Sequence, residues 1–165
     1  MSRRAIWFTQ LERVGKIPAS SETPLDSPGR LLALDLGAKR IGVAVCDELR
    51  ITARPLPMIW RRSWKELLRQ VANLVESFEA KGLVIGLPLR VGGVEGSAAE
   101  SVRTEAEKFR RSLGVPIYLQ DERLTSFAAN SDLKSAGLNQ SEIKREVDSE
   151  AAAIILRDFI DRTHS

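Results

Sequence analysis

Two short apolar segments, residues 31–36 and 41–46, are separated by only four residues, the first of which is Gly37. Strands this close can only be antiparallel neighbours joined by a tight turn, because a parallel pair needs a crossover of a dozen or more residues. A third strand is expected over residues 51–59. Its two prolines, Pro55 and Pro57, indicate a sheet edge because proline cannot donate a hydrogen bond to a neighbouring strand.

Helices and strands alternate in the rest of the chain. Ser63 and Glu66 have the spacing of a capping box, and the apolar residues of 64–78 fall on one helical face. Residues 83–87 are apolar throughout, which is typical of a central parallel strand. Further elements are expected as a helix over 98–113, a strand over 115–120, a helix over 125–136, a polar loop over 137–146 and a helix over 147–162. This order predicts an α/β fold whose five-stranded mixed sheet is antiparallel in its first three strands and then parallel, with right-handed crossovers.

The composition is that of one globular domain preceded by an extension. Of 165 residues, 43% are hydrophobic and 28% are charged, and no apolar run approaches the roughly 20 residues that a membrane span needs. The single cysteine, Cys46, cannot form an internal disulfide. We therefore expect a cytoplasmic protein without a membrane partner. Proline and serine between residues 18 and 29 predict a flexible extension over 1–29, a domain over 30–162 and a tail over 163–165.

Positive charge is concentrated in one part of the chain. The formal net charge is only +3, yet residues 37–69 hold eight basic and three acidic side chains. Such a segment can follow a phosphate backbone, and it makes Arg61 and Arg62 candidate contacts for nucleic acid. A solvated basic face explains the charge equally well.

Two acidic residues lie at the carboxyl ends of predicted strands. Asp35 stands near the end of the first strand, and Glu122 follows the strand over 115–120. Ligands of open α/β sheets gather at this edge. The alternatives are a turn-capping role for Asp35, close to Gly37, and a surface ion pair of Asp121 or Glu122 with Arg123.

A third acid, Asp148, stands at the predicted start of the last helix. Offsets of 3, 4, 7 and 11 from it reach an apolar stripe of Ala151, Ala152, Ile155 and Phe159. Asp148 is therefore expected on the core-facing side, although an interaction with the helix dipole is the alternative. Three converging carboxylates repel one another unless a cation neutralises them, and such oxygen ligands suit Mg²⁺ or Mn²⁺. Asp35, Glu122 and Asp148 thus indicate metal-assisted hydrolysis of phosphodiester bonds.

Five sequence blocks, in order and at suitable spacing, resemble the YqgF family of RNase H-like nucleases. They are LALDLGAKRIGVAVCD (32–47), VIGLPL (84–89), GGVEGSAA (92–99), DERLTS (121–126) and VDSEAA (147–152). The resemblance implies a three-layer fold with helices on both faces of the sheet. It also implies that Asp35, Glu122 and Asp148 bind the metal and serve catalysis.

The same resemblance implies a phosphate-binding set and a glycine-rich loop. Residues 86–96 resemble the family segment that contacts the nucleic-acid backbone. Cys46 and Ser126 depart from the serine and threonine that are frequent in the family. Related nucleases carry a fourth acid, for which Asp121 is the nearest spare residue here, so one metal or two both stay open. The residues implied to lie beside the scissile phosphate are Lys39, Arg40, Arg123 and Thr125.

Members of the family are named as nucleases of pre-16S rRNA and were formerly named as Holliday junction resolvases. The resemblance thus implies processing of the 5′ end of precursor 16S rRNA in ribosome biogenesis. Nucleic acid is the expected partner, together with the ribosome or its small-subunit precursor. Resolution of four-way DNA is the first alternative, and a non-catalytic RNA-binding assembly factor is the second. A sugar-kinase or actin-like ATPase would need more chain than 165 residues. Both a monomer and a dimer stay open.

Overall fold

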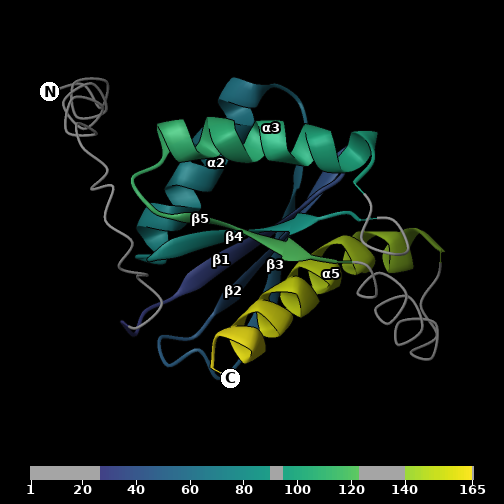
Figure 1. Cartoon of the computed structure of the whole chain (residues 1–165). Coiled ribbons are helices and arrows are strands. Elements are labelled where there is room, and N and C mark those ends of the chain that lie inside the picture. Colours follow the sequence, from purple (N-terminus) through teal and green to yellow (C-terminus); the bar gives the residue numbers. More distant parts are fainter. Residues whose placement is uncertain (1–26, 90–94, 123–139, 165) are drawn as a thin grey trace, which may run out of the picture.

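The computed structural model describes residues 27–89, 95–122 and 140–164, with the side chains of 140–148 outside the description (Figure 1). Within these ranges the chain forms five strands and three helices. They are β1 (Leu31–Leu36), β2 (Arg40–Cys46), β3 (Ala53–Trp60), α2 (Trp64–Ser77), β4 (Gly82–Leu87), α3 (Ser97–Ser112), β5 (Ile117–Asp121) and α5 (Gln140–Thr163).

The five strands form one mixed sheet in the order β3-β2-β1-β4-β5. β2 is antiparallel to both β1 and β3, whereas β4 is parallel to both β1 and β5. The predicted mixed sheet is therefore confirmed. The parallel strands bring the carboxyl ends of β1, β4 and β5 to one edge of the sheet, which is where the acids are expected to act.

Helices cover both faces of this sheet: α2 and α3 lie on one side and α5 on the other (Figure 1). Residues of β1 alternate between the two cores. Leu32 and Leu34 join the core beneath α2 and α3, whereas Leu31 and Ala33 join the core beneath α5. Because β1 carries apolar side chains on both of its faces, both sides of the sheet must be covered, and the result is a three-layer arrangement of helices, sheet and helix.

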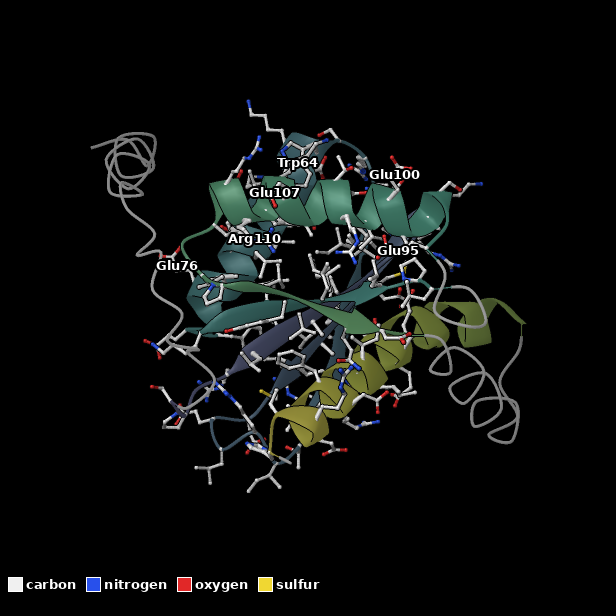
Figure 2. All side chains as sticks on the ribbon, in the orientation of Figure 1. Trp64, Glu76, Glu95, Glu100, Glu107 and Arg110 are labelled. Atoms are coloured by element: carbon white, nitrogen blue, oxygen red, sulfur yellow. The ribbon has the colours of Figure 1, made fainter. Side chains whose placement is uncertain are left out.

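The helix after β3 begins where the sequence predicts it. Ser63 is its N-cap, and the Ser63 hydroxyl accepts a hydrogen bond of 3.2 Å from the backbone N–H of Glu66. The ring of Trp64 lies against that of Phe109 from α3, with centroids 4.7 Å apart. Figure 2 shows Trp64 where α2 and α3 meet, on the side of the sheet away from α5.

Several predicted boundaries differ from the structure. The last helix begins at Gln140 rather than at residue 147, so the predicted polar loop is wrong from residue 140 onward. Its glutamate, glutamine, lysine and arginine residues are good helix formers, and they extend the helix beyond its apolar stripe. Asp148 consequently lies well inside α5, and the alternative of a first-turn dipole interaction falls away. The helix expected over 125–136 lies outside the described residues.

The third and fifth strands start two residues later than predicted. Asp47 causes the first difference, because its carboxylate accepts hydrogen bonds from the N–H groups of Ile51 (2.8 Å) and Thr52 (2.7 Å). This side-chain-to-backbone turn keeps residue 51 out of β3. In β5, Pro116 cannot donate to a ladder, and the strand begins at Ile117. None of the helices among the described residues is both long and apolar enough to cross a membrane.

Candidate active site

The structure brings Asp35 and Glu122 together. Asp35 is the fifth residue of β1, and Glu122 directly follows β5. β4 lies between these strands, so the two side chains reach toward each other over it. The carboxyl group of Glu122 is hydrogen-bonded to that of Asp35. Two acids that the sequence places at separate strand ends thus form one carboxyl pair.

Gly86 of β4 provides the space in which this pair meets. A Cβ atom at residue 86 would lie 2.5 Å from Oε2 of Glu122 and 2.6 Å from Cδ1 of Ile155 in α5. Both distances are shorter than real Cβ contacts, so a larger residue at position 86 would displace one or both side chains, whereas glycine lets both lie over the strand. The backbone N–H of Glu122 also donates to the carbonyl of Leu87 (3.2 Å). Strand and helix together therefore hold the Glu122 carboxyl on the α5 side of the sheet.

The surroundings of Glu122 raise its pKa to about 8. The largest cause is burial, which disfavours the charged carboxylate. The charge of Asp35, the hydrogen bond to Asp35 and the charge of Asp121 raise the pKa further. At neutral pH Glu122 is thus mainly protonated and donates to the Asp35 carboxylate. A carboxyl pair that keeps a proton at neutral pH is a fitting acceptor for a cation.

The donor set fits a hard divalent cation. Both groups offer carboxylate oxygens, which are preferred by Mg²⁺ and Mn²⁺. Among the side chains that the structure describes, no three acidic, histidine or cysteine groups lie close enough together to hold a metal. The expected third ligand, Asp148, is not among those side chains, so its place in the site stays a prediction.

The helix that carries Asp148 does pack as its apolar stripe predicts. Ala151, Ala152, Ile155 and Phe159 are all buried. Next to Asp148, the hydroxyl of Ser149 donates to the carbonyl of Leu56 in β3 (2.8 Å). α5 is therefore fixed against the sheet immediately after residue 148.

The predicted phosphate-binding residues fall into three groups. Lys39 is exposed in the turn between β1 and β2, and Arg62 is 73% exposed and forms a long ion pair of 3.9 Å with Glu66. Arg40 is half-buried at the start of β2. Arg123 and Thr125 lie outside the described residues.

The side chain of Arg61 binds other groups of the protein. Its Nε donates to the carbonyl of Gly37 and its Nη1 forms an ion pair with Glu105 of α3, both at 2.9 Å. The backbone N–H of Arg61 also donates to the carbonyl of Lys39 (2.9 Å). Arg61 thus ties the β1–β2 turn to α3, a role that charge patterning alone did not reveal.

Sequence reasoning assigned Gly86 only to the glycine-rich segment over 86–96 and missed its place beside Glu122, and it also missed Trp60. The position of Gly86 inside the apolar strand β4 could have indicated this role, because a glycine inside a strand often signals the close approach of another group. Trp60 is half-exposed at the end of β3, where it pairs with Arg40. A separate hollow of about 380 Å³, lined in part by Arg30, Cys46 and Arg54, contains neither Asp35 nor Glu122.

Comparison with known proteins identifies the family. The family model described as "RuvX: Holliday junction resolvase" matches residues 29–162. The chain belongs to the RuvX (YqgF) family. This confirms the resemblance seen in the sequence blocks and makes the chain a nuclease, a hydrolase of phosphodiester bonds.

RuvX relatives from several bacteria carry the name "Putative pre-16S rRNA nuclease". One from Anaeromyxobacter sp. (strain K) is 44% identical over 133 residues, covering 81% of this chain and 97% of its own. One from Syntrophus aciditrophicus (strain SB) is 40% identical over 132 residues, covering 80% and 88%. One from Rickettsia bellii (strain OSU 85-389) is 38% identical over 131 residues, covering 79% and 85%.

Among solved structures, the chain is similar to the T. thermophilus RuvC in complex with Holliday junction substrate. The TM-score is 0.47 at 16% identity, covering 83% of this chain and 97% of that one. The Fowlpox virus resolvase in complex with Holliday junction DNA gives a TM-score of 0.49 at 12% identity, covering 82% and 99%.

Proposed function

We propose that this RuvX protein cleaves precursor 16S rRNA at its 5′ end, with Asp35, Glu122 and Asp148 holding Mg²⁺ or Mn²⁺. The hydrogen-bonded pair of Asp35 and Glu122 is the observation that carries the proposal. A partly buried acid pair with a raised pKa lowers the stability of the protein as the pH rises toward that pKa, and such pairs are concentrated at functional sites. A turn cap or a surface ion pair would not need the two acids to meet.

The residues of the chain have separable tasks in this proposal. Asp35 and Glu122 project from the rigid ends of β1 and β5, so their carboxylates are preorganised. Glu122 must lose its proton before both carboxylates can bind a cation. A bound divalent cation supplies charge neutralisation at the phosphate and lowers the pKa of a coordinated water. The exposed Lys39 and Arg62 attract the phosphate backbone, and Arg123 and Thr125 contact the scissile phosphate.

Precursor rRNA is favoured because the relatives with 38–44% identity bear the name of a pre-16S rRNA nuclease. The proposed partner is accordingly the small-subunit precursor, in the cytoplasm. Residues 30–162 form the proposed catalytic domain, after an extension over 1–29 and before a tail over 163–165. One cut in RNA needs one active site, so a monomer suffices.

The family description gives a second candidate, resolution of a four-way DNA junction. That reaction needs two strands to be cut, hence two sites in a dimer. The third candidate is a non-catalytic factor that binds RNA during ribosome assembly.

Cleavage assays separate these candidates. The purified protein is incubated with a 5′-extended 16S rRNA fragment and with a four-way DNA junction, in Mg²⁺, Mn²⁺ or EDTA. We expect metal-dependent cleavage of the RNA, its loss in Asp35→Asn and Glu122→Gln, and full activity in Glu76→Gln, an exposed acid on α2 (Figure 2). Cleavage of the junction alone would replace RNA as the substrate. Tight RNA binding without any cleavage would favour the assembly factor.

A further inference from the structure

Trp60 is a large aromatic side chain left partly in water. It is 52% exposed. Among the described residues, the other exposed large apolar side chains are Leu49 and Ile51. Those two lie together in the turn between β2 and β3, whereas Trp60 ends β3. A single exposed apolar side chain needs no explanation by itself, but burying an indole ring is strongly favourable and tryptophan is enriched at binding surfaces.

Trp60 lies at the same edge of the sheet as the carboxyl pair. β1 and β3 run in the same direction because each is antiparallel to β2. The register pairs Trp60 with Arg40, and Asp35 with Gly42. Trp60 is therefore two strands from Asp35, roughly 10 Å across the sheet and about 7 Å farther out along the strands.

Trp60 also lies on the same face as the carboxyl pair. Ala44 and Cys46 belong to the core beneath α5, so alternation along β2 places Arg40 on that face too. Trp60 is the cross-strand partner of Arg40 and shares its face. Asp35 shares this face through its alternation with Ala33, which belongs to the same core.

Basic residues lie near Trp60 in the strand pairing and along the chain. Arg40 is its partner on β2, Arg62 is two residues away, and Lys39 is held near β3 by the hydrogen bond from Arg61. An exposed aromatic ring among cations is the usual means of holding single-stranded nucleic acid: cations follow the backbone while the ring stacks on a base. An apolar protein partner would fit the paired Leu49 and Ile51 better than a lone ring among cations.

We propose that Trp60 stacks on an unpaired base of the substrate, a few nucleotides from the phosphodiester bond served by Asp35 and Glu122. This inference rests on the proposed function, in which the substrate is RNA. It adds a base-binding subsite and a requirement that the RNA be single-stranded at this position, because the faces of paired bases in a duplex are already stacked.

Binding measurements in EDTA test the subsite without any cleavage. Fluorescence anisotropy compares the full-length wild type with Trp60→Ala, Trp60→Phe and the control Ile51→Ala, on a single-stranded RNA and on a duplex of the same sequence. We expect Trp60→Ala to weaken binding of the single strand about 5- to 150-fold, the range for loss of one stacked base. Trp60→Phe should lose less, and Ile51→Ala should match the wild type. None of the variants should change binding of the duplex.

Two further readouts identify stacking. The salt dependence of binding should be the same in the wild type and in Trp60→Ala, because the indole carries no charge. An abasic nucleotide at the stacked position should weaken wild-type binding but leave Trp60→Ala unaffected. Equal affinity of the wild type and Trp60→Ala for the single strand would overturn the inference. If that protein still cleaves RNA, the proposed function survives; a wild type that neither binds nor cleaves RNA would overturn both.

Discussion

The carboxyl group of Glu122 is hydrogen-bonded to the carboxylate of Asp35, over the backbone of Gly86. The two acids come from the ends of β1 and β5, which are separated in the sheet by β4. The pair keeps a proton at neutral pH, and a cation held by both carboxylates would have to displace it. Metal binding and proton release are therefore coupled at this site.

The first prediction concerns metal affinity and pH. Glu122 has a pKa of about 8 in the metal-free protein, so binding a cation displaces its proton below that pH. Affinity for Mn²⁺ should rise about tenfold per pH unit up to roughly pH 8 and then level off, since one proton is released. Calorimetric titrations between pH 6 and 9 measure this dependence. In Glu122→Gln the rise should disappear; an equal rise in wild type and variant would contradict the assignment.

The second prediction concerns stability and pH without metal. The pKa of Glu122 is about 8 in the folded protein against 4.5 for the free side chain, so between these values the folded state binds the extra proton. Stability therefore falls as pH rises from about 4.5 to 8. Glu122→Gln avoids this loss and should melt increasingly above the wild type over that range. Thermal melts in EDTA at pH 5, 7 and 9 test it, with Glu76→Gln as the control that should track the wild type.

The third prediction concerns Gly86. In Gly86→Ala the new methyl group would meet Glu122 and Ile155 at about 2.5 Å, so both must move. We expect a stability loss of about 1–3 kcal/mol, as in other overpacked sites, and a larger loss of activity because Glu122 is displaced. Gly114→Ala is the matched control, because nothing lies within 4 Å of a Cβ there. Normal cleavage by a folded Gly86→Ala protein would separate Glu122 from the chemistry.

The fourth prediction distinguishes Arg61 from Arg62. Arg61 holds Gly37 and Glu105, so Arg61→Ala should lower stability by roughly 1–3 kcal/mol and leave the salt dependence of RNA binding nearly unchanged. Arg62 is exposed, with the Glu66 carboxylate 3.9 Å away, and can turn to a phosphate. Arg62→Ala should keep stability but reduce the salt slope by about 0.7, the effect of losing one contact with single-stranded RNA. Chemical denaturation and binding at several salt concentrations test both. The opposite pattern would make Arg61 the phosphate contact.

The fifth prediction treats the three acids as one unit. Asp35→Asn, Glu122→Gln and Asp148→Asn should each remain folded and lose most activity. The double variant Asp35→Asn/Asp148→Asn should be scarcely worse than either single variant, because residues that act together have strongly non-additive effects. Cleavage rates beside thermal melts provide the comparison. An Asp148→Asn protein that melts lower but cleaves normally when folded would remove Asp148 from the site.

Much of the fold could be predicted from local patterns in the sequence. The four-residue spacing between residues 36 and 41 dictates the antiparallel start, Ser63 marks the helix start through its cap, and residues 83–87 read as a central strand. These features depend on residues that are neighbours in the chain, so they can be predicted without the tertiary structure. Asp35 and Glu122 could also be recognised as candidates, because each lies at the carboxyl end of a predicted strand and ligands bind at that edge of the sheet.

Contacts between distant segments were decided only by the tertiary structure. The raised pKa of Glu122 needs Asp35 nearby, and the engagement of Arg61 needs Glu105 from α3. In a charge count, Arg61 and Arg62 are equivalent. Packing separates them, because the Arg61 guanidinium contacts the Gly37 carbonyl and the Glu105 carboxylate at 2.9 Å, whereas the Arg62 guanidinium is mostly in water with Glu66 3.9 Å away.

The side of the sheet on which Trp60 lies could not be predicted from the sequence. Strict alternation from the buried Leu56 would place Trp60 on the side of α2 and α3. A bulge, however, lets the three residues from Ile41 to Val43 on β2 face the four residues from Leu56 to Ile59 on β3. The extra residue reverses the alternation, so Ile59 enters the core beneath α2 and α3 and Trp60 turns to the face of Asp35. The sequence by itself determined that a strand ends in tryptophan. Only pairing with β2 decided which side of the sheet the ring occupies, because a bulge is a property of two strands together.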